Sequence, residues 1–267
     1  MLVRDRISAF ALVFFAALFL CFCPDVAKPA SARSGKPESA AKSPVIVIGF
    51  VGGWVSRNNS VHREVSLAAE LRRDYPEGVF VEVYENHHPE EARRAISRLL
   101  DLDHDGSLSA AEKKDARIII YGHSWGACET VTLARWLNRQ GIPVLLTIQV
   151  DSITKPGEND VIIPPNVRQA INFYQPDGIL HGAPVIRAAD PSRTQVLGNL
   201  RFEYKDHPVD CTSFPWLART LELTHIEIET DPRVWGRIDS MIRSHLPTSS
   251  QTLASASGPN HSQATSQ

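Results

Sequence analysis

The stretch that decides the fold is Ala116–Thr130, which reads Ala-Arg-Ile-Ile-Ile-Tyr-Gly-His-Ser-Trp-Gly-Ala-Cys-Glu-Thr. Its β-favouring residues Ile118–Tyr121 run directly into Gly122–Gly126, and a helical pattern then continues to about Arg139. Gly-x-Ser-x-Gly between a buried strand and a helix is the setting of a nucleophile elbow. The sharp turn needs a small residue two positions before and after the serine, and the motif has glycine at both. Ser124 is therefore the candidate nucleophile; the alternative is a plain strand–turn–helix corner.

The composition fits one soluble domain with an extension at each end. The chain has 267 residues, of which 43% are hydrophobic and 22% charged, and its net charge is −2. Because the charge is small and no long basic run occurs, nothing indicates a nucleic-acid partner. Residues 33–43 are rich in Ser, Ala, Lys and Pro and predict a flexible lead, and the polar residues 247–267 predict a disordered tail. The predicted domain spans residues 44–246.

The first 32 residues have the form of a secretory signal peptide. Met1–Arg6 carries two arginines, Ile7–Cys23 is apolar apart from Ser8, and Ala30–Ala32 is a small-x-small site. This pattern predicts cleavage after Ala32, a secreted or periplasmic protein, and no stable membrane span after cleavage. The alternative is an uncleaved anchor, since the apolar run is close to the lower length limit of a membrane span.

Export would leave two cysteines in the mature chain, Cys128 and Cys211. An oxidising compartment permits a disulfide between them. The alternative is a pair of buried thiols, because free cysteine packs as a small hydrophobic residue. The sequence leaves both open, since it does not show whether the two Cα atoms approach each other.

Short apolar strands alternate with helical segments on both sides of the elbow. The expected strands are Pro44–Ile48, Val79–Tyr84, Val144–Val150, Ala170–Tyr174 and Gln195–Tyr204. The expected helices are Val61–Tyr75, Pro89–Leu100 and Pro232–Leu246, with a short helical turn at Asn166–Gln169 and a loop at Lys205–Leu221. Strands that are apolar throughout are typical of a sheet covered on both faces. The pattern predicts an α/β fold with a mostly parallel sheet and helices on both faces.

A loop before the elbow strand, Asp101–Glu112, matches the EF-hand pattern D-x-D-x-D-G-x5-E at every defined position. Four carboxylates so close together would repel one another without a cation. A lone loop followed by a very short helix suggests structural Ca²⁺ of modest affinity, and the alternative is an acidic surface turn. The expected ligands are the carboxylates of Asp101, Asp103, Asp105 and Glu112 and the carbonyl of Ser107, with Ser109 at the water-bridged position.

With the elbow at Ser124 and these flanking elements, the chain resembles the α/β-hydrolase superfamily in a reduced, lipase/esterase-like form, with a calcium loop inserted before the nucleophile strand. The resemblance covers Pro44–Leu246. It implies a catalytic triad in the chain order serine, acid, histidine, and hydrolysis of an ester, thioester or amide through an acyl-enzyme. It implies no redox cofactor.

The resemblance also implies two sources of backbone N–H groups for an oxyanion. One is the start of the helix after the nucleophile, which points to the N–H of Trp125. The other is the turn after the first strand, here Gly49–Trp54 with the sequence Gly-Phe-Val-Gly-Gly-Trp. Phe50 is the predicted donor in this turn, with Gly52 and Gly53 as supports.

The predicted catalytic base is His225. Family members place this histidine in a loop after the last strand and before the last helix, and His225 fits that position; the alternative is an ordinary loop histidine. Other histidines after the acid fit less well, because they lie near turns, at the end of the last helix or in the tail. These are His181, His207, His245 and His261.

Two aspartates are candidates for the triad acid. Asp151 follows the first strand after the elbow. A charged residue at the end of an apolar strand indicates a functional role, and orienting the imidazole of the base is such a role. Asp177 follows the next strand, the commoner family position, but its Pro-Asp-Gly context is also good turn chemistry. Asp151 is preferred and Asp177 is the alternative.

The sequence therefore predicts a secreted serine hydrolase with structural calcium that cleaves a small-molecule or lipid acyl ester or thioester. Two other classes stay open: a non-catalytic binding protein on a hydrolase scaffold, and a calcium-responsive module with a vestigial elbow. The acyl chain, the leaving group and the oligomeric state are not encoded in any motif of the sequence.

Overall fold

The protein is described by a computed structural model over residues 43–247. The predicted signal peptide, nearly all of the flexible lead and nearly all of the tail lie outside the described residues. Within them, none of the helices is both long and apolar enough to cross a bilayer.

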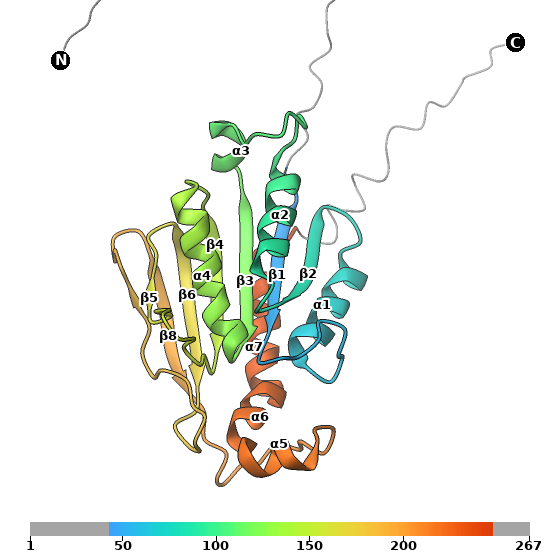
Figure 1. Ribbon diagram of the computed structural model, residues 1–267, viewed down its shortest axis with the longest axis vertical. Helices are drawn as coiled ribbons and strands as arrows, with labels where there is room; N and C mark the ends of the chain where they lie inside the picture. The colour runs from blue at the N-terminus through green and yellow to red at the C-terminus, as the bar shows by residue number, and fades with distance from the viewer. Residues whose placement is uncertain (1–42, 248–267) are drawn as a thin grey trace, which may run out of the picture. The chain divides into compact units, whose positions relative to one another are not determined.

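The core of the fold is a six-stranded sheet in which every neighbouring pair is parallel (Figure 1). In spatial order the strands are β2 (Val79–Glu85), β1 (Val45–Val51), β3 (Arg117–His123), β4 (Val144–Val150), β6 (Val167–Tyr174) and β8 (Gln195–Arg201). Two short strands, β5 (Ile162–Ile163) and β7 (Arg187–Ala188), pair beside it. The predicted α/β class with a parallel sheet is confirmed.

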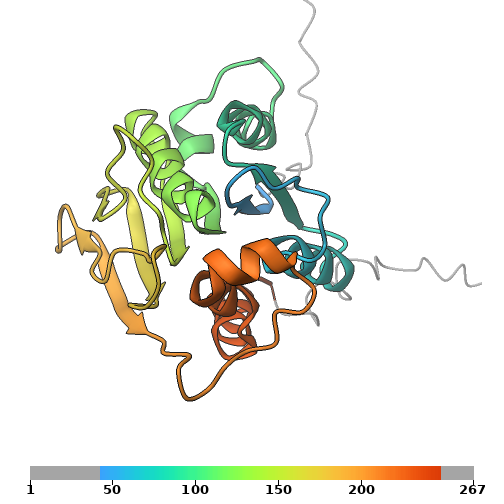
Figure 2. The same ribbon diagram turned by 60° about the horizontal axis from the view of Figure 1, so that its bottom comes forward.

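Helices cover both faces of this sheet (Figure 2). Successive residues of β1 alternate between two apolar cores: Val45 and Val47 pack in the core with α1 and α7, and Ile46 and Ile48 in the core with α2 and α4. A parallel strand buried on both faces has no polar side, which explains its unbroken apolar sequence. The helices are α1 (Arg63–Asp74), α2 (Pro89–Leu100), α3 (Ala110–Lys114), α4 (Trp125–Arg139), α5 (Trp216–Leu221), α6 (Leu223–Thr230) and α7 (Pro232–Arg243).

The structure corrects the secondary structure expected at Asn166–Gln169 and over Lys205–Leu221. The helical turn expected at Asn166–Gln169 is instead the start of β6, because Val167 pairs with Val144 of β4 and this sheet pairing outweighs local preference. The loop expected over Lys205–Leu221 ends in helix α5.

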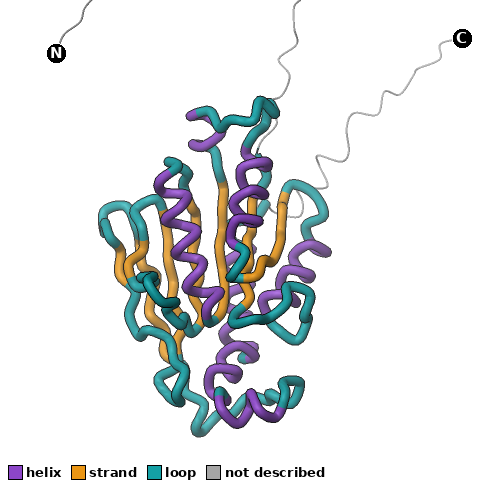
Figure 3. The backbone as a smooth tube through the Cα atoms, viewed as in Figure 1, coloured by secondary structure: helices purple, strands orange, loops and turns teal. Residues whose placement is uncertain are grey.

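All six main strands end at the same edge of the sheet, because they are parallel. Figure 3 shows the loops that follow β1, β3 and β4 at this edge, at the same end of the molecule as α5 and α6. In open α/β sheets, ligands bind outside the carboxyl ends of the strands, so the topology brings the candidate site residues to this edge.

Candidate active site

Ser124 occupies a strained turn between β3 and α4. Its backbone angles are φ 56° and ψ −127°, a region that residues with a side chain rarely adopt. Two hydrogen bonds hold it: the Ser124 N–H donates to the Val150 carbonyl at 3.0 Å, and the Ile153 N–H donates to the Ser124 carbonyl at 3.3 Å. The nucleophile turn is thereby tied to the end of the neighbouring strand and to the loop after it.

The two glycines of the motif are required by close backbone contacts. A Cβ placed on Gly122 would lie 2.6 Å from the carbonyl carbon of Gly126, and one on Gly126 would lie 2.7 Å from the carbonyl carbon of Phe50. Real Cβ atoms do not approach backbone this closely, so neither position accepts a larger residue without movement of the elbow.

Asp151 directly follows strand β4 and is hydrogen-bonded to His225. Its Oδ2 accepts a hydrogen bond from Nδ1 of His225 at 2.7 Å and another from Nε2 of Gln175 at 2.8 Å. Its Oδ1 accepts from the N–H of Gly182 at 2.7 Å. The Asp151 carboxylate is fully buried, so its hydrogen bonds to these N–H groups fix its orientation and compensate its negative charge. With Nδ1 donating to Asp151, the other ring nitrogen of His225 is the one left for chemistry.

The alternative acid, Asp177, does not meet His225. Its side chain is exposed, and its contacts run through the backbone: its N–H donates to Oε1 of Gln175 at 2.8 Å and its carbonyl accepts from Oγ1 of Thr224 at 2.9 Å. No contact of the described residues joins the Asp177 carboxylate to a histidine. The structure thus pairs Asp151, and not Asp177, with the candidate base.

The prediction that His225 lies in a loop is wrong, because the residue belongs to helix α6. The stretch around it reads as alternating polar and apolar residues, which does not suggest a helix. Tertiary packing nevertheless makes this stretch helical. Ile226 packs with Cys211 and Phe214, and Ile228 packs in the apolar core that contains α1 and α7.

Ser124 and His225 line the same cavity, which has a volume of about 490 Å³. In the described part of the chain no direct hydrogen bond joins the Ser124 hydroxyl to the imidazole. Catalytic hydrogen bonds are often long without substrate and tighten when it binds. Much of the remaining wall is apolar or aromatic, formed by Trp54, Val55, Trp125, Ile153, Leu180 and Phe214.

The structure does not place Phe50, the predicted oxyanion donor, at the cavity. Strand β1 continues to Val51, so Phe50 is paired on both sides within the sheet, and it does not line the cavity. The turn begins later, with Gly52 and Gly53, and a Cβ on Gly52 would lie 2.9 Å from the Cβ of Ser124. The sequence did not show where strand β1 ends. Because the strand was expected to end at Ile48 and continues to Val51, the predicted donor was placed too early in the chain.

Two backbone amides beside the serine are available. The N–H groups of Gly53 and Trp125 both belong to residues that line the cavity. Neither donates to any group among residues 43–247. Gly53 has a φ of 44°, which glycine tolerates. Trp125 begins helix α4, whose first N–H groups have no partner within the helix.

Beneath His225 the structure places a group of ionisable side chains that the sequence analysis missed. Nε2 of His123 lies 3.2 Å from the His225 carbonyl, and its Nδ1 lies 3.4 Å from Oε2 of Glu229. Burial, followed by the nearby charge of His225, lowers the pKa of His123 well below its ordinary value. The Glu229 carboxylate also contacts His62, and Glu64 lies beside them. The one available signal was the pair Glu227 and Glu229, which alternates with two isoleucines in α6.

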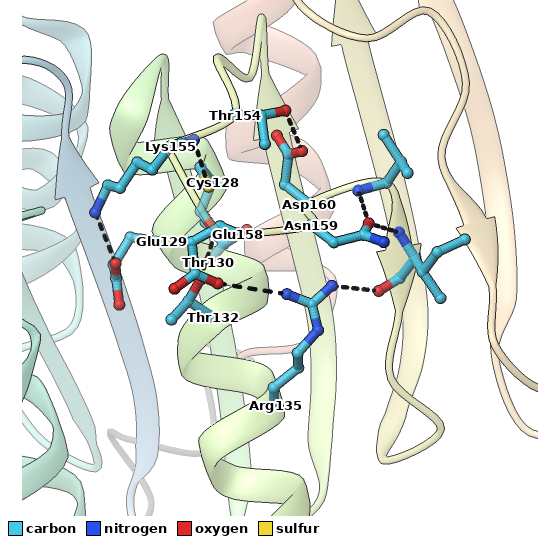
Figure 4. A network of polar contacts seen from close by, with 12 residues as sticks. Cys128, Glu129, Thr130, Thr132, Arg135, Thr154, Lys155, Glu158, Asn159 and Asp160 are labelled. Atoms are coloured by element: carbon cyan, nitrogen blue, oxygen red, sulfur yellow. Dashed lines mark hydrogen bonds and ion pairs between the residues drawn. The ribbon is translucent and has the colours of Figure 1, made fainter.

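The loop after β4 is anchored to α4 by a polar network (Figure 4). The Lys155 N–H donates to Sγ of Cys128 at 3.4 Å, and Nζ of Lys155 pairs with Oε2 of Glu129 at 2.8 Å. Within the loop, Oγ1 of Thr154 donates to Oδ1 of Asp160 at 2.6 Å. The segment directly after Asp151 is therefore held in place by its own contacts.

The two cysteines are free thiols, and both are buried. This decides between the alternatives in favour of buried thiols. Cys128 lies in α4, and burial raises the pKa of its thiol to about 11. Cys211 lies in a separate small cluster with Phe214 and Ile226.

The predicted calcium loop brings three carboxylates together. One oxygen from each of Asp101, Asp103 and Glu112 lies within 4.8 Å of the others, and Oδ1 of Asp101 is buried without a hydrogen-bond partner. The Asp105 carboxylate is not part of this group and accepts the Ser107 N–H at 2.7 Å. Clustered carboxylate oxygens with an orphaned oxygen among them fit a hard cation such as Ca²⁺.

The backbone of this loop also has the turn expected of it. Gly106 has a φ of 84°, and its N–H donates to Oδ2 of Asp101 at 3.1 Å. Ser109 and Glu112 form a capping box that starts α3. Of the four predicted carboxylate ligands, the described geometry gathers Asp101, Asp103 and Glu112, while the Asp105 carboxylate accepts the Ser107 N–H in a local turn.

No family model matches the sequence, and no curated protein matches it either. Among solved structures, the chain is similar to the RedJ thioesterase from the prodiginine biosynthetic pathway of Streptomyces coelicolor. The sequence identity is 12%, the match covers 82% of this chain and 97% of that chain, and the TM-score is 0.36. A likeness this weak carries no conclusion about activity, which depends on the site itself.

Proposed function

We propose that the protein is a serine hydrolase that cleaves an acyl ester or thioester, with Ser124 as nucleophile, His225 as general base and Asp151 as the acid that orients it. The observation that carries this proposal is the 2.7 Å hydrogen bond between Asp151 and His225, together with the shared cavity that His225 and Ser124 line. A nucleophile on a strained elbow beside a histidine oriented by a buried carboxylate is the arrangement that activates a serine hydroxyl.

The reaction follows from these positions. Nε2 of His225 takes the proton of the Ser124 hydroxyl as the oxygen attacks the acyl carbonyl carbon, and Asp151 stabilises the imidazolium that forms. The imidazolium gives its proton to the departing alcohol or thiol, which leaves an acyl group on Ser124. Water then attacks this acyl-enzyme, His225 takes its proton, and the carboxylic acid departs as Ser124 regains its hydrogen.

The N–H groups of Gly53 and Trp125 are the proposed donors to the oxyanion in both tetrahedral intermediates. Both residues line the cavity that contains Ser124, and their N–H groups are unpaired among the described residues. Fixed backbone donors need no reorganisation as charge develops, and removing one such donor from a serine hydrolase costs roughly 10²–10³ in kcat.

The cavity indicates the kind of substrate. Its volume of about 490 Å³ lies within the range of small-molecule sites, and its wall is largely aromatic and aliphatic. An apolar acyl chain would bury its surface against Trp54, Ile153 and Leu180. With the predicted signal peptide, the proposed substrate is an acyl ester or thioester met outside the cytoplasm.

The proposal is tested with a fluorophosphonate probe, which reacts with an activated serine. We expect the wild type to be labelled, Ser124→Ala not to be labelled, and the exposed-site control Ser56→Ala to behave as wild type. A wild-type protein that is folded but never labelled would favour a non-catalytic binding protein, one of the two other classes that the sequence left open. Hydrolysis of p-nitrophenyl esters and acyl thioesters of increasing chain length then defines the acyl specificity.

We also propose that the loop Asp101–Glu112 holds a structural Ca²⁺, with Asp101, Asp103 and Glu112 as its central ligands. The convergence of their oxygens and the orphaned Oδ1 of Asp101 support this proposal. Because the loop leads through α3 into β3, the ion would stabilise the entry to the nucleophile strand and take no part in the chemistry.

A further inference from the structure

Three ionisable side chains from two distant segments, the start of α1 and helix α6, meet beside the cavity. His62 immediately precedes α1, Glu64 lies in the first turn of α1, and Glu229 lies in α6. One ligand atom from each falls within 4.8 Å of the other two, and Nδ1 of His62 is 2.5 Å from Oε1 of Glu229. His62 and Glu229 line the cavity, while Glu64 lies behind them.

Glu64 is the unusual member of this group. Its side chain is fully buried, and neither carboxylate oxygen has a hydrogen-bond partner among the described residues. The Tyr121 hydroxyl nearby donates to the Glu64 backbone carbonyl and not to the side chain. A buried carboxylate without donors is strongly unfavourable, so something outside residues 43–247 is needed to compensate it.

No lysine or arginine of the described residues compensates this pair of carboxylates. The basic groups that contact the Glu229 carboxylate there are the imidazoles of His62 and His123, and Glu64 has no ion-pair partner among the described residues. A single proton shared between Glu64 and Glu229 would satisfy one oxygen of Glu64 and leave the other without a donor. A divalent cation can bind both oxygens of a carboxylate and offset both negative charges.

We propose that His62, Glu64 and Glu229 bind a divalent transition metal, with Zn²⁺ as the ion best matched to one imidazole and two carboxylates. Binding would replace the hydrogen bond between His62 and Glu229 with bonds from each to the metal, and any proton on Nδ1 of His62 would be released to solvent. Three protein ligands leave a coordination position open on the cavity side, where water or a polar group of a ligand can bind.

Such a metal would join two helices that carry the site. Glu229 lies one turn after His225 on α6, and His62 and Glu64 stand at the start of α1. α6 has only two apolar residues among its five buried positions, Ile226 and Ile228, so a metal bond at Glu229 would add a strong constraint. The ion would then position α6, and with it His225, over Ser124. Metal binding itself does not depend on the proposed hydrolase function.

The test uses the full chain without a polyhistidine tag, stripped of metal by dialysis and then titrated with Zn²⁺ by calorimetry in the presence of Ca²⁺. We expect wild type and Ser124→Ala to bind one Zn²⁺ per chain and Glu64→Gln to lose this binding. His88→Gln is the matched control, because His88 is exposed and belongs to a separate group with Glu85 and His87. We expect it to bind as wild type does.

Substitution of Co²⁺ into the wild type provides a second measurement that needs no variant. Coordination by an imidazole and carboxylates gives visible ligand-field bands, which we expect to appear as Co²⁺ saturates one site and to disappear on addition of Zn²⁺. The proposal is overturned if wild type shows no stoichiometric binding and no bands, or if Glu64→Gln binds as wild type does. A proton shared by Glu64 and Glu229 would then be the explanation, seen as an infrared carbonyl band that Glu64→Gln removes.

Discussion

Ser124 and Asp151 both have positive φ angles, 56° and 43°, at the ends of the adjacent parallel strands β3 and β4. Backbone conformations of this kind cost on the order of 1–3 kcal/mol each and persist only where the surrounding structure enforces them. Here hydrogen bonds to the neighbouring strands enforce these conformations. The Ser124 N–H donates to the Val150 carbonyl, and the Asp151 N–H donates to the Phe173 carbonyl at 2.7 Å. The strain therefore falls on the two residues proposed to act as nucleophile and acid.

Replacing Asp151 by Asn should lower kcat by about 10⁴ with the fold retained, because an amide supports the wrong tautomer of His225 and does not stabilise the imidazolium. Asp177→Asn is the control, since its carboxylate does not contact the histidine. The measurement is steady-state kinetics with an ester that the wild type hydrolyses. Loss of kcat in Asp177→Asn with activity retained in Asp151→Asn would refute the assignment of the acid.

Gly126→Ala should prevent formation of the elbow, since its Cβ would lie within contact of the Phe50 carbonyl group. Gly236→Ala in α7 is the matched control: a Cβ there meets nothing within 4 Å. Alanine in a helix is favoured over glycine by roughly 0.5–1 kcal/mol, so this control should raise the melting temperature. Thermal denaturation compares the two, and equal stability of both variants would contradict the close approach seen at Gly126.

Removal of calcium should destabilise the protein without removing a catalytic group. A ligand that binds only the folded form adds roughly 2.7 kcal/mol at a hundredfold excess over its Kd, and EGTA would remove this term. We expect EGTA and Glu112→Gln each to lower the melting temperature, and activity to fall mainly near it. The exposed substitution Glu90→Gln should keep the calcium response. A melting temperature insensitive to Ca²⁺ would identify the loop as an acidic turn.

Cys128 and Cys211 should not react with a thiol reagent in the folded protein. Both are buried, and burial raises the pKa of each thiol, to about 11 for Cys128, so little reactive thiolate forms at neutral pH. Ellman's reagent should detect no thiol before denaturation and two afterwards in the mature chain. No increase on denaturation without a reductant would reveal a disulfide instead.

The sequence by itself determined the elements whose signals are local. The elbow at Ser124, the apolar strands and the helix Pro89–Leu100 are encoded by short patterns of glycine, β-branched residues and helix caps, which need no distant partner to be recognised. Asp151 was identified in the same way, because a charge at the end of an apolar strand is visible in the sequence. Its hydrogen bond to His225 was therefore anticipated, while the catalytic roles of both remain predictions.

Only the tertiary structure decided the features that depend on where distant segments meet. Strand β1 continues past Phe50 because β2 and β3 pair with it on both sides, and this moves the proposed oxyanion donor to Gly53. His225 is helical because α6 packs against α7 and the loop around Cys211. The meeting of His62, Glu64 and Glu229 joins residues more than half the domain apart. Sequence patterns indicate the local secondary-structure preferences of neighbouring residues. The contacts among these three side chains arise instead from the packing of α1 and α6 at the same edge of the sheet.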